Sequence, residues 1–127
     1  MKIAISTDDK KTIRRDHFGD SRYYFIYEIM NGEICGDELR KNPYAIRKEY
    51  ELDQTKNIMD LLYDCQLFMG KNMDAKFLPE TAPKNIDAII TMMDDINEAV
   101  KAYLNSKDEF FKYYNAVTGK FCECSQR

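Results

Sequence analysis

A polar loop near the N-terminus holds the residues of this chain that are best suited to chemistry. His17 is the only histidine among 127 residues, and it lies between Asp16 and the pair Phe18-Gly19. A neutral imidazole can ligate iron or accept a proton near neutral pH. Asp16 or Asp20 could orient the ring, and Gly19 would permit a tight turn or a close ligand approach. A purely structural interpretation stays open, in which Phe18 plugs into the core and only anchors the loop.

Two of the four cysteines form the pair Cys122-x-Cys124 in a polar tail. Thiolates at this spacing could bind a soft metal or an iron–sulfur species, or they could form an inert or redox-labile tail. A stable metal site needs three or four ligands. His17, Cys122 and Cys124 are therefore the candidate metal ligands, with a methionine or a second protomer completing the set. Cys35 and Cys65 lie in or beside apolar runs, and we expect both to be buried thiols.

The composition indicates one globular domain, since hydrophobic residues make up 44% and charged residues 32% of the chain. No apolar run approaches the roughly 20 residues needed to span a bilayer. The N-terminal stretch lacks the apolar region of a signal peptide, so we expect a cytoplasmic protein with thiol cysteines. The net charge of −3 argues against nucleic acid as a partner, because phosphate binding requires a basic surface.

The first forty residues predict three strands. The segment 2–6 alternates polar and apolar residues, and 22–30 is rich in aromatic and β-branched residues. Asn31-Gly32 is a strong signal for a tight hairpin turn. We therefore expect 33–41 to return antiparallel to the second strand.

The rest of the chain predicts alternating helices and short strands. The expected elements are a helix starting near Asp53, a buried strand over 64–70, a helix from Met73 shortened by Pro79 and Pro83, a strand over 86–90, a helix after Asp94 or Asp95, and a last amphipathic helix over 108–115. Glu98 lies three residues after Asp95, as in a capping box. A hairpin followed by β-α-β units implies a mixed sheet with right-handed crossovers.

Six segments follow one another in an order and spacing that resemble a known family. These segments are Lys2-Ile3-Ala4-Ile5-Ser6-Thr7-Asp8-Asp9, His17-Phe18-Gly19, Asn31-Gly32-Glu33-Ile34, Asn42-Pro43, Leu61-Leu62-Tyr63-Asp64-Cys65 and 94–104. Together they are similar to the dinitrogenase iron–molybdenum cofactor biosynthesis family, which includes NifX-like proteins and the C-terminal domain of NifB. The resemblance covers roughly residues 1–105.

The resemblance implies an α/β fold of the ribonuclease H-like, three-layer type. Its five-stranded mixed sheet would have the order 3-2-1-4-5, with strand 2 antiparallel and helices on both faces. We expect residues 1–105 to form this NifX-like domain. Residues 106–127 would add an extra C-terminal helix and the Cys-x-Cys tail, either within the same domain or as an oligomer contact.

The resemblance also implies a function. Members of the family bind or carry iron–sulfur or iron–molybdenum clusters or their precursors, and many come from anaerobes. We expect a non-enzymatic accessory protein, a monomer or weak homodimer, with a cluster-donor or cluster-acceptor protein as its partner. The alternative is a cofactor-free interaction or regulatory module, because no histidines follow Asn42-Pro43 and 70–73 keeps only one glycine of the family's turn. The aromatic segment 110–114 also suggests it, since its apolar face must be covered by the domain itself or by a partner.

Ligands of open sheets bind beyond the C-terminal ends of the parallel strands, and the His17 loop can fold over that edge. The residues expected to bind a cofactor there are Thr7, Asp8, His17, Phe18, Gly19, Gly70, Asn72 and Met73. We interpret Met92 and Met93 as packing residues. A two-metal nuclease site built from Asp8, Asp9 and Asp94 is disfavoured, because capping and loop solvation also account for these carboxylates. A phosphate cradle is disfavoured because glycines are sparse.

Overall fold

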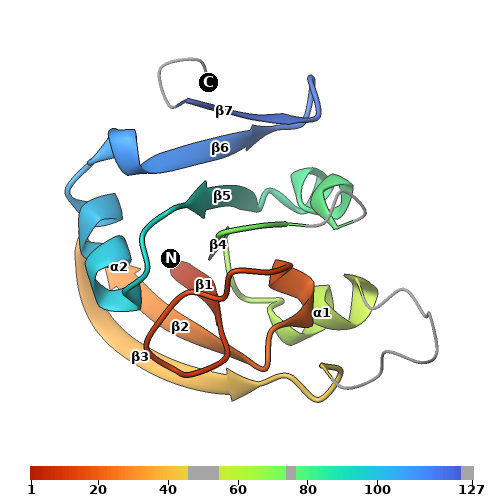
Figure 1. Cartoon of the computed structure of the whole chain (residues 1–127), viewed down its shortest axis with the longest axis horizontal. Coiled ribbons are helices and arrows are strands. Elements are labelled where there is room, and N and C mark those ends of the chain that lie inside the picture. The colour runs from red at the N-terminus through yellow and green to blue at the C-terminus, as the bar shows by residue number, and fades with distance from the viewer. Residues whose placement is uncertain (46–54, 74–76, 124–127) are drawn as a thin grey trace.

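A computed structural model describes residues 1–45, 55–73 and 77–123 of the chain. Within these residues, seven strands form one mixed sheet of order β3-β2-β1-β4-β5-β6-β7 (Figure 1). The first five strands therefore have the expected order. The expectation of a five-stranded sheet was wrong, because two further strands extend the β5 edge.

The N-terminal half forms an antiparallel ribbon. β1 (Lys2–Thr7) pairs antiparallel with β2 (Tyr23–Met30), and β2 pairs antiparallel with β3 (Glu33–Lys41). Asn31 and Gly32 join β2 to β3 with φ angles of 54° and 77°. A two-residue hairpin turn of type I′ requires positive φ at both central residues. The hairpin predicted from this dipeptide is therefore confirmed.

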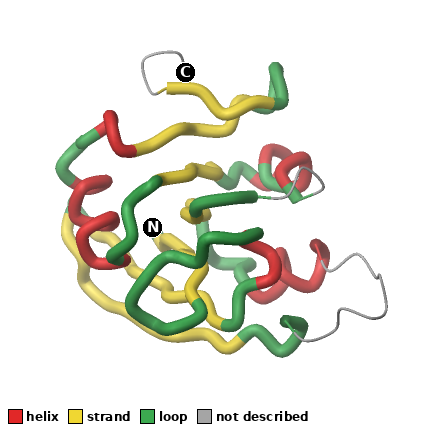
Figure 2. Tube along the Cα trace, viewed as in Figure 1, coloured by secondary structure: helices red, strands yellow, loops and turns green. Residues whose placement is uncertain are grey.

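In the part that the structure describes, the second half adds two parallel strands and two α-helices. β4 (Leu67–Gly70) pairs parallel with β1 and with β5 (Asp87–Thr91). The helices are α1 (Thr55–Leu61) and α2 (Ile96–Leu104), and they cover opposite faces of the sheet (Figure 2). Ile58 and Met59 of α1 pack with the aromatic core of one face, and Ala99 and Val100 of α2 pack on the other.

Two local helix signals have different outcomes. The Asp95 side chain accepts a hydrogen bond of 2.9 Å from the Glu98 backbone nitrogen, so the predicted cap of α2 is confirmed. The helix expected after Met73 is replaced, where the structure describes the chain, by two 3₁₀ turns, Leu78–Glu80 and Ala82–Lys84. Each turn contains a proline, which cannot donate the hydrogen bond that would continue a helix. The expected helix start at Asp53 lies outside the described residues.

The prediction of a C-terminal helix over 108–115 was wrong. After a 3₁₀ turn, Asp108–Phe110, the chain forms β6 (Phe111–Asn115) and β7 (Lys120–Glu123), a hairpin whose first strand pairs antiparallel with β5. Phe111 and Tyr113 point into the core that α2 covers, and their spacing of two is the period of a strand. The free edge of β5 supplies hydrogen-bonding partners that the sequence could not reveal.

Only one of the two cysteines expected to be buried is buried in the structure. Cys65 is buried, as expected, whereas Cys35 is exposed. β3 lies at the edge of the sheet, and alternation along the strand turns Ile34 toward the core and Cys35 away from it. Among the described helices, none is long and apolar enough to cross a membrane.

Candidate functional site

The segment that follows β1 lies across the C-terminal ends of the parallel strands. In Figure 1 it is the red loop in front of the sheet. The Ile13 nitrogen donates to the Asp94 carbonyl over 2.8 Å, and the Phe18 nitrogen donates to the Asn72 carbonyl over 2.9 Å. These bonds attach the loop to the segments that follow β5 and β4. The loop therefore covers the edge of the sheet at which ligands of this architecture bind. We call this edge, at the C-terminal ends of β1, β4 and β5, the mouth.

Phe18 anchors the loop. Its ring is fully buried and contacts the rings of Tyr24, Phe68 and Phe77 at centroid distances of 5.0, 5.1 and 5.5 Å. The Tyr24 hydroxyl donates to the Phe18 carbonyl over 2.6 Å, and burial raises the pKa of Tyr24, so this donor stays protonated. Phe18, which we expected to contact a cofactor, has no surface to offer a ligand in this structure.

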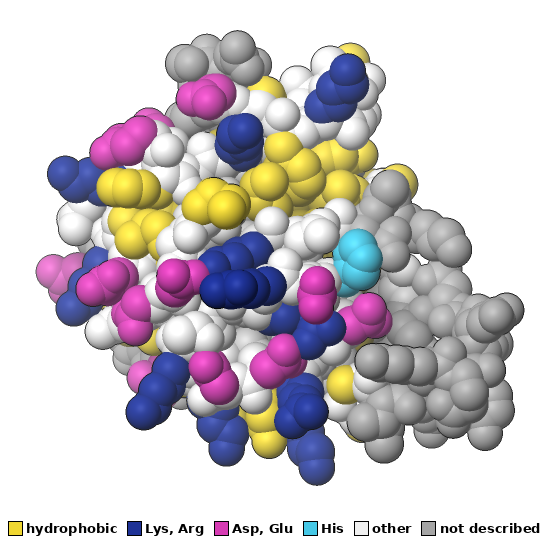
Figure 3. Space-filling view, in the orientation of Figure 1, with side chains coloured by type: hydrophobic (Ala, Val, Ile, Leu, Met, Phe, Trp, Pro, Cys, Tyr) yellow, Lys and Arg dark blue, Asp and Glu magenta, His cyan; other side chains and the backbone are white. Residues whose placement is uncertain are grey.

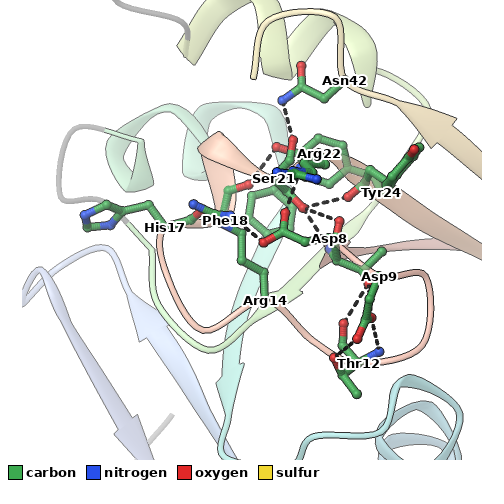
Figure 4. Close-up of polar contacts among 12 residues, drawn as sticks. Asp8, Asp9, Thr12, Arg14, His17, Phe18, Ser21, Arg22, Tyr24 and Asn42 are labelled. Carbon is green, nitrogen blue, oxygen red and sulfur yellow. Dashed lines mark hydrogen bonds and ion pairs between the residues drawn. The ribbon is translucent and has the colours of Figure 1, made fainter. Parts of the chain in front are cut away.

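His17 has the opposite environment. Its side chain is exposed (Figure 3) and points away from the polar contacts that hold the loop (Figure 4). Its carbonyl accepts hydrogen bonds from Arg14 Nε and from the Asp20 nitrogen, each 3.2 Å long. Among the described residues, none is hydrogen-bonded to the imidazole, so neither Asp16 nor Asp20 orients the ring as expected. The backbone of His17 is fixed and its imidazole is available.

The acidic residues at the start of the loop are used to shape it. Asp8 forms an ion pair with Arg14 at 2.5 Å and accepts from the Arg22 nitrogen at 3.0 Å. Asp9 accepts from the hydroxyl and nitrogen of Thr12 at 2.6 and 2.7 Å, and these bonds with Thr12 lower the pKa of Asp9. Asp8, an expected cofactor contact, therefore has a structural role here.

A second ion pair lies beside the loop, between the segments that follow β4 and β5. Lys71, after β4, forms an ion pair with Asp94, after β5, and its hydrogen bond lowers the pKa of Asp94. Each carboxylate considered for a two-metal site thus has a partner within the protein. This pair joins the segments that follow β4 and β5, a contact that the sequence did not indicate.

The floor of the mouth is closely packed. A β-carbon on Gly70 would lie 3.1 Å from Ser6 Oγ and 3.3 Å from Phe18 Cδ2. Both distances are tighter than ordinary contact, so a side chain at Gly70 would require Ser6 and Phe18 to shift by a few tenths of an ångström. The nearest atom to a β-carbon on Gly19 would be 4.0 Å away, in Phe77. The glycine that the packing requires is Gly70, and Gly19 has room for a methyl group.

The remaining predicted binding residues line this floor. Thr7 is fully buried and its hydroxyl donates to the Thr12 carbonyl over 2.7 Å. Met73 is buried in the aromatic core, while the exposed Asn72 contributes its backbone carbonyl to Phe18. Ser6 Oγ, which the sequence did not single out, is buried without a hydrogen-bonding partner among the described residues.

The three metal ligands expected from the sequence do not come together where the structure describes them. His17 lies beside the segment after β4, and Cys122 lies on β7, three strands further along the sheet. Three strand spacings amount to about 14 Å, far beyond the reach of a shared ion. Cys122 Sγ instead lies 3.6 Å from the Tyr113 carbonyl, and Cys124 is outside the described residues. No three His, Cys, Asp or Glu side chains in the described ranges cluster around a possible metal ion.

Comparison with known structures supports the fold. The protein PH0822 has a TM-score of 0.69 at 17% identity, covering 84% of this chain and 92% of its own. MJ0327 of Methanocaldococcus jannaschii, named as a dinitrogenase candidate, has a TM-score of 0.64 at 20% identity and covers 84% and 90%. TM1290 of Thermotoga, named as a NifB candidate, has a TM-score of 0.59 at 16% identity and covers 84% and 89%.

Sequence comparison identifies the family. No curated protein matches the chain significantly. The family model described as "Dinitrogenase iron-molybdenum cofactor" matches residues 1–106, which confirms the resemblance seen in the motifs. The match ends just before the turn that leads into β6, so the C-terminal hairpin is an addition to the shared domain. The chain belongs to the dinitrogenase iron–molybdenum cofactor family.

Proposed function

We propose that this protein is a non-catalytic accessory protein that binds an iron–sulfur or iron–molybdenum-type cluster, or its precursor, and transfers it. The family supports an association with this cofactor. The observation that carries the proposal is the environment of His17, whose backbone is fixed while its imidazole is exposed. The order of the first five strands is compatible with a ribonuclease H-like fold.

A fixed backbone is an advantage for a ligand that must receive cargo. The peptide group between His17 and Phe18 is held at both of its polar atoms, since the His17 carbonyl accepts from Arg14 and the Phe18 nitrogen donates to the Asn72 carbonyl. Only the side-chain torsions of His17 remain to be ordered when the imidazole binds iron, so the entropic cost is small. Fe–S clusters accept imidazole in place of thiolate at some of their iron atoms.

The described residues fit one coordination position of a cluster and do not form a closed cage. His17 is the exposed imidazole at the mouth, and the carboxylates of Asp8 and Asp94 are already paired with Arg14 and Lys71. The other ligands of the cargo would then come from the donor or acceptor protein, or from a second protomer. Incomplete coordination suits a carrier, because a cluster held by few ligands is easily released.

The test is cluster reconstitution without oxygen, using iron and sulfide with a low-molecular-weight thiol to supply the other ligands. We expect the wild type and Asp16→Asn to retain iron through gel filtration, and His17→Ala to lose it. Because the chain has one histidine, its imidazole gives a single set of NMR resonances, which bound paramagnetic iron would broaden. Absence of retained iron in the wild type, or equal retention in His17→Ala, would refute the proposal.

The alternative function is a cofactor-free interaction module. The observation that favours it is the exposure of large apolar side chains near the mouth, namely Met92 at 85% and Phe110 at 46%. Most of the aromatic segment that first suggested this alternative is covered by the protein itself, since Phe111 and Tyr113 are buried. Analytical ultracentrifugation of the wild type and Phe110→Ala would detect self-association through this surface.

A further inference from the structure

A groove of about 420 Å³ lies beside the mouth, between the C-terminal end of β5 and the β6–β7 hairpin. Thr91, Met92 and Met93 form one wall, and Glu109, Phe110 and Lys112 form the other. On this face, apolar side chains gather over β5 and β6 (Figure 3). Volumes from roughly 300 to 1,000 Å³ are typical of small-molecule sites, so the size of the groove suits a small ligand.

The groove depends on the C-terminal addition. The family model ends at residue 106, so only the wall from Thr91 to Met93 belongs to the shared domain. The opposite wall is formed by the 3₁₀ turn Asp108–Phe110 and by β6. Binding here would therefore be a property of this chain, separate from the proposed function of the His17 loop.

The two walls are already fixed to each other. Thr91 is buried, and its hydroxyl donates to the Phe110 carbonyl over 2.8 Å. The same oxygen accepts from the Met93 nitrogen at 3.2 Å. A groove that is formed before binding avoids the cost of ordering its walls when a ligand arrives.

The lining is apolar with an acidic bias. Met92 and Phe110 expose large apolar surfaces, and the flexible thioethers of methionines adapt to ligands of irregular shape. Lys112 lies directly opposite Glu123 in the register of β6 and β7, so these two charges offset each other. Glu109 has no ion pair among the described residues. Its carboxylate gives the groove a net negative charge beside an exposed aromatic ring.

We propose that this groove binds a small organic cation with an apolar or aromatic body. The body lies against Met92, Met93 and Phe110, and the ammonium head lies beside Glu109. The face of the Phe110 ring attracts a cation, and so does the carboxylate of Glu109, so the two groups favour the same ligand charge.

Three probes that share a phenylbutyl body and differ in charge test the proposal: 4-phenylbutylamine, 4-phenylbutanol and 5-phenylpentanoate. Binding is followed by ¹³C methyl NMR of the seven methionines of the full-length chain. We expect the amine to shift the Met92 and Met93 methyl signals saturably, roughly fivefold more tightly than the alcohol, as expected for an exposed charge pair. The carboxylate should bind more weakly than the alcohol.

Variants locate the site. Phe110→Ala should weaken amine binding roughly tenfold, the value of a partly buried aromatic contact. Met92→Ala, at a more exposed position, should also weaken it, and Glu109→Gln should remove the advantage of the amine over the alcohol. Tyr63→Ala and Val117→Ala, at exposed apolar positions outside the groove, should bind as the wild type does. Non-saturable shifts, equal binding of the carboxylate, or full binding by Phe110→Ala would overturn the proposal.

Discussion

Phe18 and Gly70 pack against each other beneath the His17 loop, so closely that a β-carbon on Gly70 would require its neighbours to shift. It would lie 3.3 Å from Phe18 Cδ2 and 3.1 Å from Ser6 Oγ. The position of the loop over the mouth thus depends on a glycine at the end of β4, fifty-two positions away in the chain from the ring that it accommodates.

Gly70→Ala should destabilise the protein by about 1–3 kcal/mol, because an added methyl group in a packed interior forces its neighbours to move. Gly19→Ala is the matched control. Its β-carbon has space, and its effect should stay within about 1 kcal/mol in either direction. Urea denaturation of both variants measures the difference. Equal destabilisation would show that the contact with Phe18 does not set the requirement for glycine.

Ser6→Ala and Ser21→Ala compare two fully buried hydroxyls. Ser6 Oγ has no partner among the described residues, so its removal should cost less than about 0.5 kcal/mol or stabilise the protein. Ser21 Oγ accepts from the Thr7 nitrogen at 2.8 Å, and the Thr7 and Tyr23 carbonyls lie within reach of its one proton, at 2.9 and 2.7 Å. Its removal leaves a buried nitrogen unpaired and should cost about 1–3 kcal/mol. Thermal unfolding would separate the two, and the reverse order would contradict the assignment of Ser6 as unpaired.

His17→Ala and Phe18→Ala distinguish presentation of a ligand from anchoring. His17 is exposed, so its replacement should change the free energy of unfolding by at most about 0.5 kcal/mol. Phe18 is fully buried against three rings, and its replacement should cost about 3–5 kcal/mol. Both are measured by denaturant titration. A large loss of stability in His17→Ala would mean that the histidine is structural.

Asp64 should make stability depend on pH in the acid range. Arg40 donates to both Asp64 oxygens over 2.7 Å, and Lys2 donates over 3.0 Å. These contacts, that with Arg40 first, hold the pKa of Asp64 below its ordinary value of 3.8. The unfolded carboxylate therefore takes up a proton at a higher pH than the folded one. The stabilisation is complete above the ordinary pKa and is lost as the pH falls below it.

Asp64→Asn should lower stability at pH 7 by about 1–3 kcal/mol, the usual value of hydrogen bonds to a charged group. It should also flatten the dependence of stability on pH below about 4. The control is Asp60→Asn, which changes an exposed carboxylate on α1. Unfolding curves from pH 2 to 7 test this, and an unchanged slope in Asp64→Asn would assign the acid sensitivity to other groups.

Phe111→Ala and Phe110→Ala test the C-terminal strand. Phe111 is buried on the α2 side and makes an edge-on contact with Tyr103 at 6.0 Å, so its loss should cost about 3–5 kcal/mol. Phe110 is half exposed, so its replacement should lower the free energy of unfolding by at most about 1 kcal/mol. Denaturation midpoints of the two variants give the comparison. Similar effects would be inconsistent with β6 as a core strand.

Short-range signals determined much of the fold from the sequence. Asn31-Gly32 produced its hairpin, because both residues adopt positive φ at low cost. Asp95 capped α2, since the interaction spans only three residues. The order of the first five strands was not a local signal but was implied by the resemblance to the family, and His17 was correctly placed in a loop over the mouth.

Only the tertiary structure decided the features that depend on distant partners. The apolar residues from Phe110 to Tyr114 are compatible with a helix or a strand, and the free edge of β5 selected the strand. Cys35 is exposed because β3 lies at the edge of the sheet. His17 and Cys122 lie apart because three strand spacings separate their segments. Local sequence specifies backbone conformation over a few residues, whereas exposure and ligand clustering depend on which segments the folded sheet brings together.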